Sequence, residues 1–207
     1  MNKFQSAMRE LPLVAILRGL KPAEASAIGT VLVEAGFRLI EVPLNSPQPL
    51  ESVAFLKKQF PQALVGAGTV LKAQDVRAVA AAGGELIVAP NFNREVVALT
   101  VKLGLVSLPG ILTPTEAFAA LDAGAHGLKL FPSEIVSPAV VKALLAVLPE
   151  DTPIVPVGGI GADNMKAWRE AGAAGFGLGS SLYKPGDDAA TVAKKAAMIV
   201  AAWKALT

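Results

Sequence analysis

Short apolar runs, each followed by a helix-like segment, succeed one another along the chain, and this alternation repeats eight times. Several of the predicted helices end at a glycine, as at Gly36 and Gly124. Strands that alternate with helices indicate βαβ units and therefore a parallel sheet. The predicted strand and helix pairs are 13–18 with 22–35, 39–44 with 47–60, 64–67 with 73–82, 86–89 with 94–103, 105–108 with 114–123, 127–131 with 138–148, 154–157 with 163–171, and 175–178 with 187–205.

Eight such pairs in 207 residues predict an α/β fold, a single-domain (β/α)8 barrel over residues 1–207. Residues 1–9 are expected to form a short N-terminal amphipathic helix. The alternative is a doubly wound open sheet. Its first helix would lack the G-x-G-x-x-G signature, so dinucleotide binding has no support.

Composition excludes several other classes of protein. An apolar content of 53% argues against disorder, but no apolar run approaches the roughly 18 residues of a membrane span. The first residues have no apolar signal core, so we expect a cytoplasmic protein. A net charge of +2 without a long basic run gives no support for nucleic-acid binding. The chain has no cysteine, scattered acidic residues and one histidine, His126, which precedes the predicted sixth strand, at the end of the barrel where the strands begin, and we expect no role for it. The sequence therefore has no obvious set of metal ligands.

Polar and small residues gather after the predicted strands, and the strand starts are plainly apolar. A barrel of this class carries its active site at the carboxyl ends of its strands. We therefore expect the residues at these ends to form one site. They include Arg18, Glu41, Asn45, Thr69, Pro90, Lys129, Gly158, Gly159, Gly179 and Ser180.

Lys129 lies in the middle of the run Gly127–Pro132, which is too short and too β-like to be a helix. Alternation along a strand puts it on the same face as Gly127 and Phe131. Burial against apolar walls would lower the lysine pKa toward the free amine, which forms Schiff bases with carbonyl groups. The alternative is a lysine whose stem covers apolar surface while its charge reaches water.

Glu41 is predicted to face the barrel interior together with Leu39 and Pro43. An interior carboxylate is costly to ionise unless it is paired. It could therefore form a salt bridge with Lys129 or Arg18 that only neutralises the core. It could also be an acid/base group whose pKa is tuned by the same burial.

Two glycine-containing turns, at Gly158-Gly159 and at Gly179-Ser180, follow the last two predicted strands. In barrels, the loops after strands seven and eight commonly bind phosphate, because glycine lets backbone N–H groups approach an anion. Glycine also serves close helix–strand packing, so the turns alone leave both possibilities open.

Arg18 and Thr69 follow the first and third strands. Arg18 could clamp a carboxylate in a bidentate manner or be a solvated charge at a strand end. Thr69 could offer its hydroxyl to the same carboxylate or cap the next helix.

Five segments in order resemble the class I 2-keto-3-deoxy-6-phosphogluconate/galactonate aldolase family, and they extend over nearly the whole chain. They are Ile16–Gly19, Glu41–Pro47, Gly66–Val70, Lys129–Ser133 and Val157–Gly159. The resemblance implies a (β/α)8 homotrimer that reversibly cleaves a phosphorylated keto sugar acid to pyruvate and D-glyceraldehyde 3-phosphate. It implies no metal or cofactor.

The resemblance also implies roles for individual residues. Lys129 would form an imine with the substrate ketone, and Glu41 would move protons. In the substrate-binding set, Arg18, Thr69 and the Pro90 segment would bind the pyruvyl carboxylate, Phe131 would pack beside the imine, and Gly158, Gly159, Gly179 and Ser180 would bind the phosphate.

Asn45 and Val157 complete the substrate-binding set, and these two positions bear on which epimer is the substrate. The gluconate branch of the family usually carries Arg where this chain has Asn45, and Thr where it has Val157. The chain therefore resembles the galactonate branch, whose substrate is 2-dehydro-3-deoxy-6-phospho-D-galactonate. A valine methyl in place of a hydroxyl removes one hydrogen-bonding option near the reacting centre. The alternatives are an aldolase for the gluconate epimer, a barrel isomerase or decarboxylase, or a non-enzymatic sugar-phosphate sensor.

Overall fold

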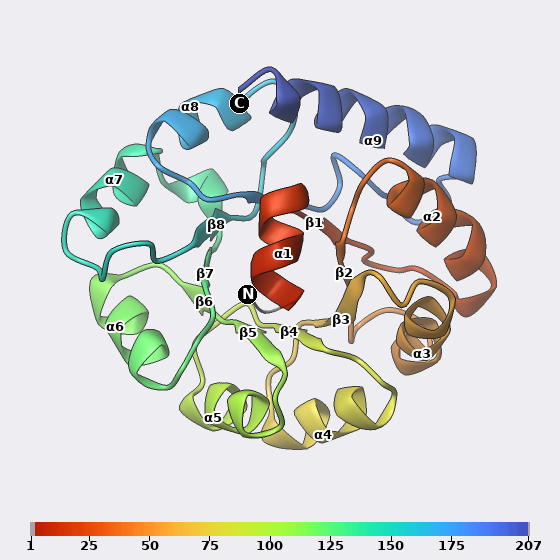
Figure 1. The fold of residues 1–207 in the computed structure, drawn as a ribbon, viewed down its shortest axis with the longest axis horizontal. Helices are drawn as coiled ribbons and strands as arrows, with labels where there is room; N and C mark the ends of the chain where they lie inside the picture. The colour runs from red at the N-terminus through yellow and green to blue at the C-terminus, as the bar shows by residue number, and fades with distance from the viewer. Residues whose placement is uncertain (1–2, 207) are drawn as a thin grey trace.

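Strands and helices alternate along the chain in the computed structural model, which describes residues 3–206 (Figure 1). The strands are β1 (Leu13–Ile16), β2 (Leu39–Pro43), β3 (Leu64–Gly68), β4 (Leu86–Val88), β5 (Val106–Leu108), β6 (Gly110–Ile111), β7 (Leu128–Leu130), β8 (Ile154–Pro156) and β9 (Phe176–Leu178). The helices are α1 (Lys3–Glu10), α2 (Pro22–Glu34), α3 (Pro49–Gln59), α4 (Ala73–Ala81), α5 (Arg94–Lys102), α6 (Pro114–Asp122), α7 (Ala139–Leu145), α8 (Met165–Glu170) and α9 (Ala189–Lys204), with a 3₁₀ turn η1 (Ser133–Ile135). Met1 and Asn2, which we placed in the N-terminal helix, lie outside the described residues.

All the strand pairings are parallel, and they divide the strands into two sheets. The larger sheet has the order β5-β4-β3-β2-β1-β9, and the smaller has the order β6-β7-β8. Within residues 3–206, one isolated parallel bridge, between Val157 and Gly177, connects the two sheets on one side. The helices surround the strands in a ring (Figure 1). The α/β class and the parallel arrangement of the strands are therefore confirmed.

The region of the predicted fifth strand differs from the expectation. We predicted one strand over 105–108, but the structure has β5, then Pro109, then the short strand β6. Pro109 has no N–H group, so it cannot donate to a strand ladder. β5 pairs with β4, whereas β6 pairs with β7. The chain thus passes from the larger sheet to the smaller one at this proline.

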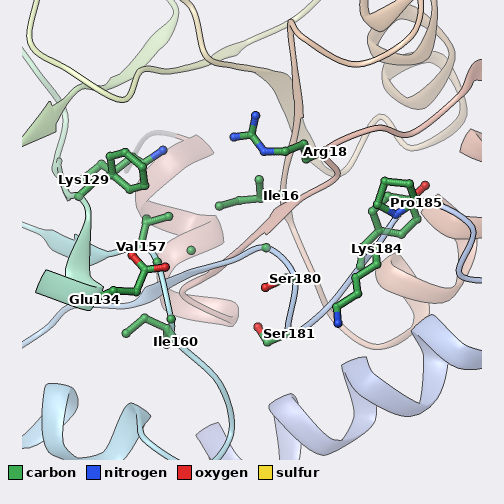
Figure 2. Close-up of a pocket in the computed structure, with 16 residues that line it drawn as sticks. Ile16, Arg18, Lys129, Glu134, Val157, Ile160, Ser180, Ser181, Lys184 and Pro185 are labelled. Carbon is green, nitrogen blue, oxygen red and sulfur yellow. The ribbon is translucent and has the colours of Figure 1, made fainter.

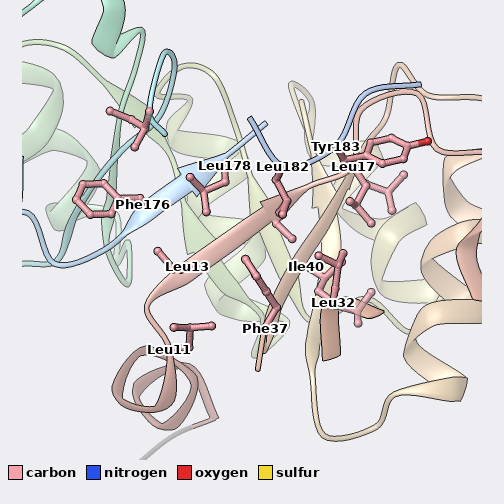
Figure 3. Packing of buried hydrophobic residues seen from close by; sticks show 14 of the residues in the cluster. Leu11, Leu13, Leu17, Leu32, Phe37, Ile40, Phe176, Leu178, Leu182 and Tyr183 are labelled. Carbon is pink, nitrogen blue, oxygen red and sulfur yellow. The ribbon is translucent and has the colours of Figure 1, made fainter. Parts of the chain in front are cut away.

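The two faces of the strands carry separate apolar clusters. On β2, Ile40 and Val42 belong to the larger cluster between strands and helices, part of which Figure 3 shows. Leu39 belongs to the second cluster, together with Leu64 and Leu86. The predicted alternation of β2 is therefore confirmed. Glu41 falls on the side of Leu39, opposite the cluster that Ile40 and Val42 form with the surrounding helices.

The helix α1 closes the end of the molecule at which the strands begin. Its Phe4 and Ala7 pack in the same cluster as Leu39, Leu64 and Leu86, the first residues of their strands. In Figure 1, α1 lies across the middle of the ring of helices. The polar residues that follow the strands, such as Arg18 and Ser180, lie at the opposite end, where the strands finish.

Several helices end or begin a few residues away from the predicted bounds. The predicted stops at Gly36 and Gly124 are confirmed, with φ of 103° and 94°, a conformation that glycine adopts without strain. The helices predicted at 47–60 and 138–148 are shorter, at Pro49–Gln59 and Ala139–Leu145. Helix ends are the least regular part of a helix, so such offsets change no topology.

Candidate active site

Lys129 points into the space enclosed by the strands. Its neighbours Leu128 and Leu130 pack in the helix-side cluster, so alternation along β7 places the lysine on the opposite face. The residue is 6% exposed, and its Nζ lies 4.7 Å from the centre of the Phe131 ring. Burial lowers the pKa of the Lys129 amine; the charge of Glu41 opposes this effect and that of Arg18 adds to it. The amine is therefore closer to its neutral, nucleophilic form than that of an ordinary lysine.

Glu41 is a buried carboxylate with an unsatisfied oxygen. The residue is 1% exposed, and Oε2 has no hydrogen-bond partner among the described residues. Burial raises the pKa of Glu41 to about 7, although the charges of Lys129 and Arg18 both act to lower it. A carboxyl group with this pKa can both take and give a proton near neutral pH.

A cavity of about 290 Å³ opens at the carboxyl ends of the strands (Figure 2). The turns after β1, β7, β8 and β9 supply most of its wall. In Figure 2, Lys129 and Arg18 lie at one side of the cavity, with Ser180 and Ser181 further along it. The predicted site residues that line it are Arg18, Lys129, Phe131, Val157, Gly158, Gly159, Gly179 and Ser180.

Four predicted residues do not line this cavity: Glu41, Asn45, Thr69 and Pro90. Glu41 is connected to it through its electrostatic interaction with Lys129. Asn45 is connected through a 2.8 Å hydrogen bond that it accepts from Arg18. Thr69 follows β3 with a φ of 56°, which is unusual for a β-branched residue. The structure therefore brings Glu41 and Asn45 to the site indirectly.

Pro90 follows β4 and contacts the backbone of β6. A Cβ atom on Gly110 would lie 2.3 Å from the carbonyl carbon of Pro90, so the two backbones pass in very close contact. This packing places Pro90 against the strand that pairs with β7.

The glycine turn after β8 is shaped by its neighbours. Gly158 and Gly159 have φ of 105° and 66°. A Cβ atom on Gly158 would overlap the Glu134 carboxylate, so a larger residue there would displace that side chain and would strain the backbone at this φ. Asn164 donates to the Gly159 carbonyl at 2.7 Å and accepts from the N–H of Gly161 at 3.0 Å. These two hydrogen bonds brace the turn, whose glycines line the cavity.

The sequence analysis missed several residues of the cavity wall, above all Ser181 and Lys184. The Oγ of Ser181 is buried without a partner among the described residues, and Lys184 is an exposed cation. Glu134 and Ile160 also line the cavity. Ser181 and Lys184 belong to the same loop as the predicted Ser180. The cluster of hydroxyl groups and a lysine after the last strand was the signal that could have identified them.

His126 packs at the end of the molecule that α1 closes. Its ring meets that of Phe4 edge to face, at 6.4 Å between centres, and its Nδ1 accepts a 3.2 Å hydrogen bond from the N–H of Ser107. Among residues 3–206, no group of three or more His, Cys, Asp or Glu side chains could hold a metal ion. In that same part of the chain, no helix has the length and apolarity needed to cross a membrane.

Comparison with known proteins identifies the family. The model of the family described as "Aldolase: KDPG and KHG aldolase" matches residues 4–195. The probable 2-dehydro-3-deoxy-6-phosphogalactonate aldolase of Rhizobium meliloti (strain 1021) is 46% identical over 207 residues, which is 100% of this chain and 98% of that protein. The 2-dehydro-3-deoxy-6-phosphogalactonate aldolase of Escherichia coli (strain K12) is 47% identical over 94% of this chain and 96% of its own length.

A solved structure described as native KDPGal superposes on the fold with a TM-score of 0.94 and 46% sequence identity. The alignment covers 95% of this chain and 96% of the other. The identity, the coverage and the family match agree with one another and with the five segments recognised in the sequence. The chain belongs to the KDPG and KHG aldolase family, whose members are carbon–carbon lyases.

Proposed function

We propose that this chain is a class I aldolase that reversibly cleaves 2-dehydro-3-deoxy-6-phospho-D-galactonate to pyruvate and D-glyceraldehyde 3-phosphate. The observation that carries the proposal is the environment of Lys129. This lysine lies on the cavity wall, is 6% exposed, and has a pKa lowered by burial. It interacts electrostatically with Glu41, whose pKa is about 7. The two relatives described above, both named for the galactonate epimer, support the choice of substrate.

The first chemical step is attack by the Lys129 Nζ on the C2 ketone. Loss of water from the resulting carbinolamine leaves a protonated imine between the enzyme and the substrate. The positive nitrogen acts as an electron sink, which a ketone oxygen in the same place could not do as well. Burial supports this step because it favours the neutral amine before attack.

Glu41 carries the proton transfers. It takes the proton of the C4 hydroxyl through an intervening water molecule, and the C3–C4 bond breaks as its electrons move into the imine. D-glyceraldehyde 3-phosphate leaves, and the enamine that remains is protonated at C3 by Glu41. Hydrolysis of the new imine then releases pyruvate and restores the Lys129 amine. A pKa of about 7 suits a group that must act as both base and acid.

The two ends of the substrate are charged, and the cavity has groups for each. Arg18 binds the carboxylate, assisted by Thr69 and the Pro90 segment, and Phe131 packs beside the imine. The phosphate lies on the backbone of the Gly158-Gly159 and Gly179-Ser180 turns. The unpartnered hydroxyl of Ser181 and the positive charge of Lys184 belong to the same part of the wall and support an anion there.

Val157 carries the epimer preference. It is 8% exposed, lies on the cavity wall and cannot donate or accept a hydrogen bond with its side chain. A substrate hydroxyl directed at it is left unpaired, which disfavours that epimer.

The proposal extends to the architecture. The two sheets act as one eight-stranded (β/α)8 barrel, with β5 and β6 as the two halves of a strand broken at Pro109 and the Val157–Gly177 bridge at the second junction. In the family implied by the sequence motifs, such barrels assemble as homotrimers, and we propose the same for this chain. Light scattering coupled to gel filtration measures the oligomer directly.

The decisive test is trapping with borohydride. Pyruvate and borohydride together should attach a reduced pyruvyl group to Lys129 and abolish activity, and mass spectrometry of a digest locates the adduct. Lys129→Met is the matched control, because it keeps an unbranched side chain and removes the amine. A Lys129→Met protein that still cleaves the substrate at the wild-type rate would rule out the imine route.

A coupled assay for pyruvate release, run on both epimers, separates the remaining alternatives. We expect release from both the galactonate and the gluconate compound, with the larger kcat/KM for the galactonate. Thermal stabilisation by the sugar acid without pyruvate release would instead indicate a sensor. A ratio that favours the gluconate epimer would overturn the substrate assignment only.

A further inference from the structure

Arg18 is tied to the neighbouring turn by its side chain. Its Nη1 donates a 2.8 Å hydrogen bond to the Oδ1 of Asn45, which comes from the turn after β2. Arg18 lines the cavity, and both it and Asn45 are exposed rather than packed in the core. Among residues 3–206, the hydrogen bond to Asn45 is the one that the guanidinium makes, and Glu41 interacts with it only through its charge.

The backbone next to Arg18 is held independently. The N–H of Gly19 donates to the Oγ of Ser46 at 2.9 Å, which joins the same two turns a second time. Gly19 has a φ of 84°, and a Cβ atom on it would lie 2.6 Å from the ring of Pro185. The turn is thus enclosed between two loops. The backbone at this turn is therefore fixed, and only the Arg18 side chain can change its conformation.

The geometry of the guanidinium leaves room for a substrate. An arginine has five N–H donors in a planar fork, and the hydrogen bond to Asn45 uses one of them. The others remain for a planar carboxylate, which arginine binds best when the fork is already oriented. The amide Nδ2 of Asn45 donates to none of the side chains or backbone groups described for residues 3–206.

We propose that Asn45 is a positioning residue: its Oδ1 orients the Arg18 guanidinium toward the carboxylate of the keto acid, and it acts through Arg18 rather than on the substrate. This inference rests on the proposed function, since it requires that Arg18 bind that carboxylate. It assigns to Asn45 a role different from the direct substrate contact that the sequence motifs imply.

A double-mutant cycle tests the proposal. The variants are Asn45→Ala, Arg18→Met and the double variant, and the measured quantities are kcat/KM for cleavage and the pyruvate concentration that half-saturates borohydride trapping. Pyruvate has the carboxylate but no phosphate, so trapping isolates this end of the site. We expect Asn45→Ala to raise the half-saturating concentration about tenfold, with a smaller change in the maximal trapping rate. In the Arg18→Met background the same substitution should have no further effect.

Two more variants sharpen the result. Asn45→Asp keeps an oxygen acceptor for Arg18, so it should lose less pyruvate binding than Asn45→Ala, although its added negative charge repels the pyruvate carboxylate. Gln59→Ala is the matched control. It removes another exposed amide hydrogen bond, from Gln59 on α3 to Ser26 on α2 at 3.2 Å, and neither residue lines the cavity, so trapping should be unchanged.

The possible outcomes separate the two proposals. If wild-type protein is not labelled by pyruvate and borohydride, the proposed function fails, and this inference fails with it. If the wild type is labelled, but Asn45→Ala either has no effect or weakens binding equally in both backgrounds, only the role of Asn45 is overturned. If Asn45→Ala weakens pyruvate binding only in protein that retains Arg18, the positioning role of Asn45 is supported.

Discussion

The carboxylate of Glu41 lies directly against Gly68, the last residue of the neighbouring strand β3. A Cβ atom on that glycine would come within 2.0 Å of Oε2 and 2.4 Å of Oε1 of Glu41. The same Oε2 atom has no hydrogen-bond partner among the described residues. The absence of a side chain at position 68 therefore makes the space that the proposed acid/base group occupies.

Substitution of Gly68 by Ala should displace this carboxylate. We expect a loss of about 1–3 kcal/mol in the free energy of unfolding, as is usual for overpacking a core, and a fall in kcat. Denaturant unfolding measures the first quantity. In a Glu41→Ala background the added methyl group has room, so Gly68→Ala should then cost much less. Equal costs in the two backgrounds would show that the two side chains do not compete for space.

The pH dependence of the reaction should reflect Glu41. As the base in the proposed cleavage, it must be ionised in the free enzyme, and its pKa is about 7. We expect kcat/KM to rise with pH through this value. Glu41→Gln should lower the rate about 10²–10⁴-fold, because positioned proton transfer contributes about that much. Full activity in this variant would assign the proton transfers to another group.

The same carboxyl group should make the protein less stable as pH rises, whereas it makes the reaction faster. Its pKa rises from 4.5 to about 7 on folding, so between these values the folded protein holds a proton that the unfolded chain has lost. The free energy of unfolding should therefore decrease as pH rises from about 4.5 to about 7, by roughly 3 kcal/mol in total, and the contribution should be constant above that range. Unfolding of the wild type and of Glu41→Gln across this range measures the difference, and the variant should lack this slope. Parallel curves would contradict the raised pKa.

Substitution of Val157 by Thr should change the preference between epimers. Threonine has nearly the shape of valine and adds a hydroxyl group on the cavity wall. We expect the ratio of kcat/KM values to move toward the gluconate epimer by about tenfold. Val155→Thr is the matched control, because Val155 belongs to the same inner cluster but does not line the cavity. It should cost stability and leave the ratio unchanged, and a shift of similar size there would contradict the assignment.

Several features of the site could be predicted because they depend on local periodicity. The alternation of β2 and β7 places Glu41 and Lys129 on the inner face, and the observed burial of both residues agrees with it. The glycine stops at Gly36 and Gly124 follow from the same kind of local rule. The roles of these site residues, the single domain and the cytoplasmic location remain predictions.

Other features depend on contacts between segments far apart in the sequence. They include the passage of the chain from one sheet to the other at Pro109, the burial of the Ser181 hydroxyl and the hydrogen bond between Arg18 and Asn45. Each depends on the register of neighbouring strands and on the path of the loops between them. These are set by packing over the whole molecule rather than by the residues of one turn.

The sequence by itself determined the order of the elements, the face on which each strand residue lies and the end of the strands at which polar groups collect, because the side-chain period of a strand is a property of its own backbone. Only the tertiary structure decided how much water reaches those groups. Burial moves the pKa of Lys129 down and that of Glu41 up to about 7. Desolvation comes from every neighbour that surrounds a charge, and those neighbours are drawn from strands and loops throughout the chain.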